Sequence, residues 1–248
     1  MNQIFMRCHV NSDNSIKLPN EQLDRSVYLN VKKELTALGG KWVGGKTQAF
    51  VFNFDPTELL CRLQNGDADI KKRLQFFPTP KPLAKELVQL SEIESHHSIL
   101  EPSAGHGAII SEILSVHPGQ IHICEIDPTN QNILNKNFGN QIYLIKEDFL
   151  QLDLINKNEY YDRIIANPPF NKGQDITHVK HMYECLKPGG ILVTFTSTSW
   201  QFNSIKRSQL FREWVSEVRA EIIPVERQAF SESGTEIPTL ILKIRKDV

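Results

Sequence analysis

The stretch that decides the fold is Ile-Leu-Glu-Pro-Ser-Ala-Gly-His-Gly, residues 99–107, in which an apolar run ends at an acidic residue and enters a turn with two glycines. Glycines in a strand-to-helix turn let a ligand approach the backbone and aim the helix amino terminus at it. A dinucleotide fingerprint needs a third glycine, in the pattern G-x-G-x-x-G, and this turn lacks it. Residues 99–107 therefore predict a strand followed by a ligand loop, with a tight turn that binds nothing as the alternative.

Two further strand candidates also end at acidic residues. The first ends in Glu125-Ile126-Asp127-Pro128, and the second in Glu147-Asp148-Phe149. A carboxylate that follows the glycine turn by about 20 residues can accept both hydroxyls of a ribose. Taken alone, Glu125 is better explained as a solvated residue at a strand end. Asp148 offers an acceptor for an exocyclic amine, with an aromatic ring beside it. Because the carboxyl ends of parallel strands share one edge, these residues together predict a site for an adenosine cofactor without a pyrophosphate.

A fourth strand candidate ends in Asn167-Pro168-Pro169-Phe170. The two prolines fix the backbone and remove two donors, which leaves carbonyls that can only accept. The Asn167 side-chain oxygen and the Pro168 carbonyl can then both face one NH₂ group, while Phe170 offers a stacking surface. A rigid exit loop without a chemical role is the alternative, but the three preceding strand ends favour a catalytic motif.

From residue 76 onward, strand candidates alternate with helix candidates, which is typical of a parallel sheet covered on both faces. The strand candidates are residues 98–101, 120–125, 141–145, 162–166, 191–196, 220–225 and 238–244. The helix candidates are residues 82–93, 108–116, 129–138, 176–186 and 204–218. The sequence thus predicts a Rossmann-like α/β domain with seven strands.

Residues 1–75 have a different pattern and predict a small α+β domain with a basic linker. Apolar residues recur every three or four positions over residues 23–38, which indicates a helix that Gly39-Gly40 ends. The pair Gly44-Gly45 separates two strand-like runs, residues 41–43 and 49–54, as in a hairpin. A helix follows over residues 55–66, and the linker contains Lys71, Lys72 and Arg73.

Composition excludes several classes of protein. The 248 residues are 40% hydrophobic, and 28 Lys and Arg nearly balance 29 Asp and Glu, so the chain is neither disordered nor a polycation. The 4 cysteines form no C-x-x-C pair and have no His at metal spacing, which predicts reduced thiols and no metal site. With neither a signal sequence nor an apolar run of about 20 residues, we expect a cytoplasmic protein without a membrane partner.

The motifs, taken in order, resemble those of class I S-adenosylmethionine-dependent amino-methyltransferases, and most closely those of DNA adenine-N6 methyltransferases. The segments that carry the resemblance are Phe76-Phe77-Pro78-Thr79-Pro80, residues 101–107, residues 125–128, Asp148-Phe149-Leu150 and Asn167-Pro168-Pro169-Phe170. The resemblance covers residues 76 to 245 and implies a seven-stranded methyltransferase domain over residues 76–248, with S-adenosyl-L-methionine as cofactor.

The resemblance also implies a role for each matching residue. The residues that it assigns to the cofactor are Phe77, Thr79, Glu101, Pro102, Ala104, Gly105, Gly107, Glu125, Ile126, Asp148, Phe149 and Asn167. Within this set, Glu125 takes the ribose hydroxyls, and Asp148 and Phe149 take the adenine. Catalysis is assigned to Asn167, Pro168, Pro169 and Phe170, with Phe170 stacking on the target base. His106 departs from the family pattern, and we expect a surface histidine there.

The same resemblance leaves the polymer open, because RNA bases and a protein glutamine amide also present a planar NH₂ group. The opening segment and the glycine loop favour DNA over RNA, and RNA over protein. A non-catalytic binding protein is the remaining alternative. A base inside a duplex cannot reach such a pocket, so the target has to be flipped out or unpaired.

Further substrate contacts are predicted outside the motifs. Phe230 lies in the loop before the last strand and is expected either to pack on the target base or to fill a hairpin core. Trp200 and Phe202 follow the fifth strand and could line the substrate cleft. Residues 1–75 hold 11 Lys and Arg against 8 Asp and Glu, and Lys41 and Lys46 flank Trp42. A basic surface with an aromatic residue predicts non-specific nucleic-acid binding, with a core role for Trp42 as the alternative.

Overall fold

The computed structural model describes residues 2–52, 55–66, 79–117, 119–153, 160–226, 229–230 and 237–248. Its contacts divide the chain into two compact units. One unit consists of Met1–Pro78 with Phe230–Thr235, and the other of Thr79–Ala229 with Glu236–Val248. Phe77 and the linker residues Lys71, Lys72 and Arg73 lie outside the described residues.

The first unit is a four-stranded antiparallel sheet with the order β1-β2-β4-β3. Its elements are α1 (Asn2–Phe5), β1 (His9–Val10), β2 (Ser15–Lys17), α2 (Arg25–Ala37), β3 (Lys41–Val43), β4 (Ala49–Val51) and α3 (Thr57–Gln64). The predicted hairpin is confirmed, because Trp42 pairs with Phe50 across β3 and β4. The sequence analysis missed β1 and β2, which are too short to show a periodic pattern.

The second unit is built on a seven-stranded sheet with the order β10-β11-β9-β8-β5-β6-β7. Its strands are β5 (Ile99–Glu101), β6 (Ile121–Cys124), β7 (Ile142–Lys146), β8 (Tyr161–Ala166), β9 (Leu186–Ser197), β10 (Glu221–Pro224) and β11 (Thr239–Arg245). All seven predicted strands are present. β11 is antiparallel to both of its neighbours, whereas the pairs from β9 to β7 are parallel.

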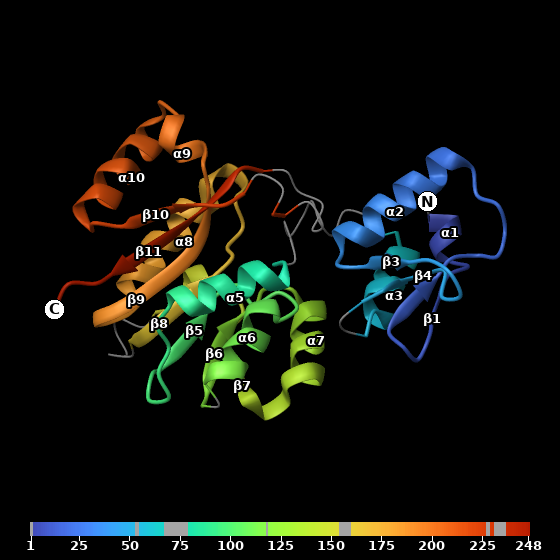
Figure 1. Cartoon of the computed structure of the whole chain (residues 1–248), viewed down its shortest axis with the longest axis horizontal. Helices are drawn as coiled ribbons and strands as arrows, with labels where there is room; N and C mark the ends of the chain where they lie inside the picture. The colour runs from blue at the N-terminus through green and yellow to red at the C-terminus, as the bar shows by residue number, and fades with distance from the viewer. Residues whose placement is uncertain are drawn as a thin grey trace. The chain divides into compact units, whose positions relative to one another are not determined.

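Helices cover both faces of this sheet (Figure 1). They are α5 (Lys81–Leu90), α6 (Ala108–Val116), α7 (Pro128–Phe138), α8 (Gln174–Glu184), α9 (Ser199–Phe202) and α10 (Lys206–Glu217), with short 3-10 turns η1 (Gly139–Gln141), η2 (Phe149–Gln151) and η3 (Asn171–Gly173). From β5 the chain steps to β6 and β7 in one direction, and from β8 to β9 in the other. Because such crossovers are right-handed, α6 and α7 lie on one face and α8 on the opposite face.

The order of the strands reverses between β5 and β8, which are hydrogen-bonded neighbours. In open α/β sheets, ligands bind outside the carboxyl ends of the strands at such a point. The glycine loop follows β5 and the Asn-Pro-Pro-Phe segment follows β8, so the fold brings the two motifs to either side of this reversal.

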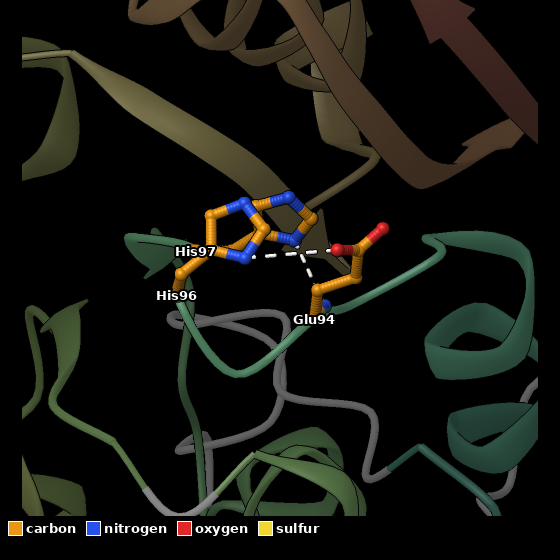
Figure 2. Close-up of side chains that lie close together, drawn as sticks. All are labelled: Glu94, His96 and His97. Carbon is orange, nitrogen blue, oxygen red and sulfur yellow. Dashed lines mark hydrogen bonds and ion pairs between the residues drawn. The ribbon is translucent and has the colours of Figure 1, made fainter.

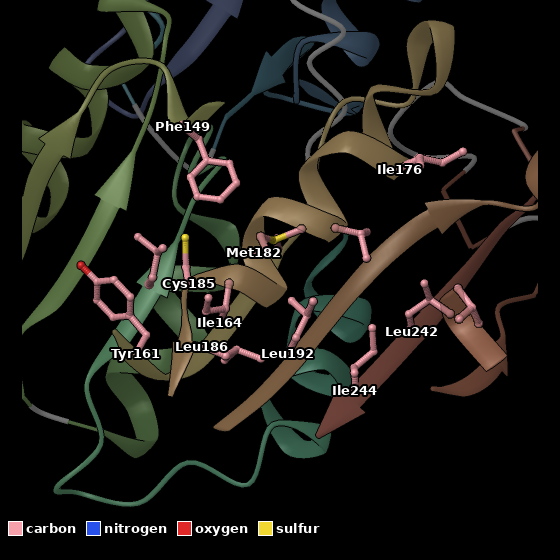
Figure 3. Close-up of a cluster of buried hydrophobic side chains, with 14 of the residues drawn as sticks. Phe149, Tyr161, Ile164, Ile176, Met182, Cys185, Leu186, Leu192, Leu242 and Ile244 are labelled. Carbon is pink, nitrogen blue, oxygen red and sulfur yellow. The ribbon is translucent and has the colours of Figure 1, made fainter. Parts of the chain in front are cut away.

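A continuous apolar core holds α8 and α10 against the sheet (Figure 3). Ile164 and Leu192 of the central strands are fully buried, and Met182 of α8 packs on them. Leu242 and Ile244 extend the core into β11. This packing makes the strand ends a rigid platform for the loops that follow them.

One element is longer than predicted, because β9 begins at Leu186 rather than at residue 191. The segment Lys187-Pro188-Gly189-Gly190 lies inside the strand as an irregularity, and the pairing register with β8 shifts there. Gly189 has a φ of 76°, which permits this bend. No helix in the described part of the chain is long and apolar enough to cross a membrane.

Candidate functional site

The glycine loop after β5 is shaped by two residues with positive φ angles. Gly105 has a φ of 55° and Gly107 a φ of 82°. A Cβ atom on Gly107 would overlap the ring of Phe138, so only glycine lets α7 approach the start of α6 this closely. Ala104 N donates to Cys124 O at 3.1 Å, which fixes the loop to the end of β6.

Glu125 is the centre of the hydrogen-bond network at this edge. Its Oε2 accepts from Gly105 N at 2.7 Å, and its Oε1 accepts from Asp127 N at 2.8 Å and from Asn130 Nδ2 at 3.2 Å. Burial raises the pKa of the Glu125 carboxyl, while these hydrogen bonds act in the opposite direction. The sequence analysis missed Asn130, whose place in the first turn of α7 could have indicated a partner for Glu125.

Glu101, the last residue of β5, has a buried carboxyl group that lacks a hydrogen-bond partner for one of its oxygens among the described residues. It is 1% exposed, and its Oε2 has no hydrogen-bond partner among the described residues. Burial, together with the nearby charge of Glu125, raises its pKa well above the usual range. The Ser103 hydroxyl in the adjoining turn is also buried without a partner there. Such orphaned buried groups are typical of a binding site.

The segment after β7 forms local hydrogen bonds between its own residues. Asp148 accepts from Leu150 N and from Gln151 Nε2, both at 3.0 Å, and so caps η2. The Phe149 ring is 3% exposed and packs on the rings of His178 and His181 in α8, with centroids 5.8 and 4.7 Å away. Ile126, at the neighbouring strand end, is 58% exposed and offers an open apolar surface at the same edge.

The Asn-Pro-Pro-Phe segment begins directly after β8. Asn167 Nδ2 donates to Thr79 Oγ1 at 3.0 Å, across 88 positions of sequence. The bond connects two motifs that were singled out separately in the sequence, and it fixes the position of the Asn167 amide, whose Oδ1 is an acceptor by its chemistry. Pro168 is buried, whereas Pro169 and Phe170 are half-buried. The predicted cofactor residues Pro102 and Ala104 lie in the glycine loop opposite.

His106 differs from the expected surface histidine. Its side chain is partly buried in the glycine loop, and desolvation lowers its pKa to about 3, although a hydrogen bond with Asn130 and the charge of Asp127 act in the opposite direction. The ring is therefore neutral at physiological pH. The expectation was wrong because the sequence does not show that α7 folds back over this loop.

A further buried acid, Asp175, supports the loop after β8 and was missed in the sequence analysis. It lies in the first turn of α8, and its Oδ2 accepts from Ser197 N and Ser197 Oγ, both at 2.9 Å. Burial raises its pKa against these hydrogen bonds. Asp175 thus joins the ends of β8 and β9, the two strands that carry the Asn167 loop and α9.

The remaining predicted substrate residues occupy varied positions. Trp200 is 2% exposed in the core, where its Nε1 donates to Thr196 Oγ1 at 3.1 Å. Phe230 is buried and belongs to the same unit as Met1–Pro78. Trp42 is half-buried and packs edge to face on Phe50 with centroids 5.1 Å apart, whereas Lys41 and Lys46 are exposed.

A polar cluster outside this site lies in the turn between α5 and β5 (Figure 2). Each of Glu94, His96 and His97 offers one atom suited to a metal, and the three atoms lie within 4.8 Å of one another. His97 Nδ1 already accepts from Glu94 N at 2.8 Å, and His96 Nδ1 lies 3.6 Å from Glu94 Oε2. The cluster is at the amino end of β5, opposite the glycine loop, so we assign it no part in the chemistry there.

Comparison with known protein families decides the assignment. A family model described as conserved hypothetical protein 95 matches residues 75–217, which is more than half of the chain. The chain belongs to this methyltransferase family. The match includes the glycine loop, Glu125 and the Asn167 segment of this family member.

Two curated relatives of this family member differ in the polymer that their names imply. Modification methylase CviBIII of Paramecium bursaria Chlorella virus NC1A is 31% identical over 144 residues, 49% of this chain and 37% of that protein. Ribosomal RNA small subunit methyltransferase A of Prochlorococcus marinus (strain MIT 9301) is 30% identical over 104 residues, 41% of this chain and 38% of that protein. The chain thus spans well under half the length of each relative.

A solved structure shows the same fold as this family member. The type I restriction-modification system methyltransferase subunit from Streptococcus thermophilus superposes with a TM-score of 0.59 at 18% identity, covering 75% of this chain and 49% of that one. At this level of identity the likeness concerns the fold alone. It confirms the seven-stranded class I methyltransferase sheet predicted from the sequence.

Proposed function

We propose that this protein transfers a methyl group from S-adenosyl-L-methionine to an exocyclic amine of a nucleobase, with adenine N6 in DNA as the favoured target. The observation that carries the proposal is the hydrogen bond from Asn167 Nδ2 to Thr79 Oγ1. This bond fixes the Asn167 amide, and Asn167 Oδ1 and the Pro168 carbonyl are acceptor groups by their chemistry in one proline-stiffened segment. That pair suits the two N–H bonds of a planar amine.

The groups at the ends of β5 and β6 fit S-adenosylmethionine. The unpartnered Glu101 Oε2 and Ser103 Oγ lack donors, and a cationic ligand with an ammonium group supplies both charge and donors. Glu125 accepts three hydrogen bonds, while a carboxylate has about four lone-pair sites. A ribose diol therefore requires one donor to leave, and Asn130, which makes the longest of the three bonds, is the expected one.

In this proposal, the Asn-Pro-Pro-Phe segment orients the amine of the substrate. An aromatic amine is a poor nucleophile because its lone pair is delocalised into the ring. By accepting both N–H bonds, Asn167 Oδ1 and the Pro168 carbonyl favour a pyramidal nitrogen and aim its lone pair. Phe170 offers a stacking face for the base. When bound, S-adenosylmethionine supplies an electrophilic methyl group, and this chemistry requires no metal or strong general base.

A methyl-transfer assay tests the proposal. The full chain is incubated with S-adenosylmethionine carrying a radiolabelled methyl group and, in separate reactions, with DNA, RNA or protein. We expect label in DNA, and N6-methyladenine among its nucleosides after digestion. The Asn167→Ala variant is the control for label that does not come from this site. Label in protein alone would contradict a nucleobase target.

RNA is the second candidate polymer, and the similarity to ribosomal RNA small subunit methyltransferase A favours it. The acceptor pair at Asn167 and Pro168 suits an amine on an RNA base equally well. The same assay separates the two polymers, because label in RNA with none in DNA of the same sequence selects RNA.

We also propose that residues 1–75 bind the nucleic-acid backbone, so that methylation is relaxed in sequence. The exposed Lys41 and Lys46 support this role, and the net positive charge of the segment adds to it. Replacing Lys41, Lys46, Lys71, Lys72 and Arg73 together should flatten the salt dependence of binding and leave cofactor affinity unchanged. Modification of one long defined site only would contradict relaxed specificity.

A further inference from the structure

An open pocket of about 600 Å³ lies over the outer face of α8 and the first turn of α10. We call it the α8–α10 groove and define it by Ile176, Lys180, Lys206, Arg207 and Leu210. Ile176 lies in the first turn of α8, only a few residues after Phe170. The groove thus begins beside the Asn-Pro-Pro-Phe segment and continues along α8.

Arg207 joins the groove directly to this segment. Its guanidinium donates to the carbonyl oxygen of Lys172, in the η3 turn that follows Phe170. Gly173 has a φ of 69°, and a Cβ atom there would overlap the Arg207 guanidinium. Gly173 therefore allows the Arg207 side chain, at the start of α10, to lie against the loop that contains Phe170. A ligand held at Arg207 is held next to the proposed base site.

The charge of the groove is positive. Lys180, Lys206 and Arg207 line it, and the acidic residue Glu184 at its far end faces His181 Nδ1 at 3.5 Å. Lys172 is exposed just beyond the groove. Within the described part of the chain, neither Lys172 nor Lys206 forms an ion pair. These two ammonium groups are therefore available to phosphates.

The first turn of α10 contains basic side chains, although acidic side chains are the ones that stabilise the positive end of a helix dipole. The turn contains no acidic residue, and its N-cap residue, Ile205, makes no side-chain capping bond. Lys206 and Arg207 thus add positive charge to the positive end of a helix of 12 residues. This arrangement costs stability unless an anion binds, which agrees with the charge of the groove.

An exposed aromatic ring lies in the same segment. Phe202, the last residue of α9 and four positions before Lys206, is 84% exposed. Trp200 in the same short helix is buried, so exposure is particular to Phe202. An exposed aromatic face in a segment that also carries ammonium groups suits an unpaired base, because a base within a duplex is stacked on its neighbours. A duplex could meet the lysines but would leave Phe202 in water.

We propose that the α8–α10 groove, with Lys172 and Phe202, binds the unpaired nucleic-acid strand that flanks the target base. Lys172, Lys206 and Arg207 contact its phosphates, and Phe202 stacks on one neighbouring base. The inference rests on the proposed function and deepens it, because it assigns strand binding to the methyltransferase unit itself. Strand binding is thereby separate from the contribution proposed for residues 1–75.

The experiment measures binding of short labelled single strands of DNA and RNA, and of duplex DNA, by fluorescence anisotropy over a range of salt concentrations. For the double variant Lys172→Glu and Lys206→Glu, we expect at least tenfold weaker strand binding at low salt. The slope of log affinity against log salt should fall in magnitude by about 0.7 for each phosphate that the variant no longer neutralises. Phe202→Ala should weaken binding about fivefold to 100-fold without changing this slope.

Matched variants control for net charge and hydrophobicity. Lys85→Glu with Lys136→Glu makes the same change in charge on α5 and α7, and should bind as the wild type does. Phe202→Tyr keeps an aromatic face and should bind strands as tightly as the wild type, unlike Phe202→Ala. Calorimetry with S-adenosylmethionine checks that each variant is folded, because none of these residues lies in the cofactor site.

The outcomes separate this inference from the proposed function. If the wild type methylates nucleic acid but the groove variants bind every strand as the wild type does, the groove assignment is wrong and the proposed function stands. If the wild type methylates none of the polymers, the proposed function fails and the inference fails with it. Selective weakening of either DNA-strand or RNA-strand binding supports the inference and identifies the polymer.

Discussion

Buried or partly buried carboxyl groups at the two ends of the parallel strands differ in their hydrogen-bond partners and in the direction of their pKa shifts. At the amino edge, Asp162 of β8 accepts from Ser98 N at 2.8 Å, from Ser98 Oγ at 2.7 Å and from Lys187 Nζ at 2.7 Å. Although desolvation opposes ionisation, these bonds lower the pKa of Asp162 to about 2. At the carboxyl edge, Glu101 has a buried oxygen without a partner among the described residues and a pKa raised by burial.

This contrast separates stability from binding. A fully paired carboxylate such as Asp162 stabilises the folded chain at neutral pH. A buried carboxyl with a raised pKa, such as Glu101 or Glu125, lowers stability there and is kept for another reason. A paired, stabilising carboxylate thus lies at one edge, and the carboxyls proposed to bind the ligand lie at the other. The predictions that follow test this division.

Asn167→Ala should produce the largest effect. It removes one of two acceptors for the substrate amine, and loss of one such group costs about 100-fold to 1,000-fold in rate. Affinity for S-adenosylmethionine should fall less than in Glu125→Ala, because the change leaves Glu101 and Glu125 in place and removes only the bond to Thr79 among the residues assigned to the cofactor. Single-turnover methyl transfer and calorimetry measure the two quantities. A variant that loses cofactor affinity first would place Asn167 in cofactor binding rather than in chemistry.

Glu125→Ala should weaken S-adenosylmethionine binding by about 1.5–3 kcal/mol, the range for hydrogen bonds to a charged group. The change also frees Gly105 N and Asp127 N, so part of the loss reflects a less ordered loop. Asp148→Ala is the companion variant, and its loss should be smaller because Asp148 is less buried and caps its own turn. Equal affinity of wild type and both variants by calorimetry would remove the carboxyl edge from cofactor binding.

Asp162→Asn tests the amino edge and should lower the free energy of unfolding by about 1–3 kcal/mol at neutral pH. Because the folded pKa lies below the ordinary value of 3.8, the stabilisation is complete above about pH 4 and is lost as the pH falls towards 2. Denaturant unfolding of wild type and variant over this pH range measures the difference. Glu92→Gln, which removes a half-exposed carboxylate paired with both Lys243 and Arg245, is the comparison, and its cost should be smaller than that of Asp162→Asn because solvent screens these pairs.

The sequence predicts the architecture of the site better than its electrostatics. The strands and their terminal residues are visible because a buried parallel sheet requires apolar runs, and glycine or proline marks the exits of β5, β6 and β8. The partners of Glu125 and Asp162 are not visible in this way. Ser98, Asn130 and Lys187 meet these acids only because the strands pair in one register and α7 packs on the glycine loop. His106 was misjudged for the same reason.

The short strands β1 and β2 show a second limit of the sequence. Two or three residues cannot display alternation, so the pairing of β2 with β4 and of β1 with β2 follows from tertiary packing. Trp42 illustrates the same point, because its flanking lysines suggested a surface role while its ring packs on Phe50. In both cases the neighbours across the sheet decide the outcome, and they are distant in the chain.

Among these variants, Glu101→Gln should have the smallest effect on the affinity for S-adenosylmethionine. It should also change how the stability of the folded chain depends on pH. Gln keeps an acceptor oxygen but loses the charge, so binding of S-adenosylmethionine should weaken by about 1 kcal/mol. Without cofactor, the variant should become more stable relative to wild type as the pH rises. Glu147→Gln, an exposed carboxyl at the same edge, is the control and should show neither change.

The direction of this pH dependence follows from proton binding. Because the folded pKa of Glu101 is raised, the unfolded chain releases its proton near the ordinary value of 4.5 while the folded chain keeps it. Wild-type stability is therefore complete below pH 4.5 and falls as the pH rises towards the folded pKa, and Glu101→Gln removes this fall. Cationic S-adenosylmethionine should lower the pKa of Glu101 and release protons on binding, which calorimetry in buffers of different ionisation enthalpy detects. Parallel pH profiles for wild type and variant would mean that Glu101 is ionised in the free protein, and the two edges would then not differ in the way proposed.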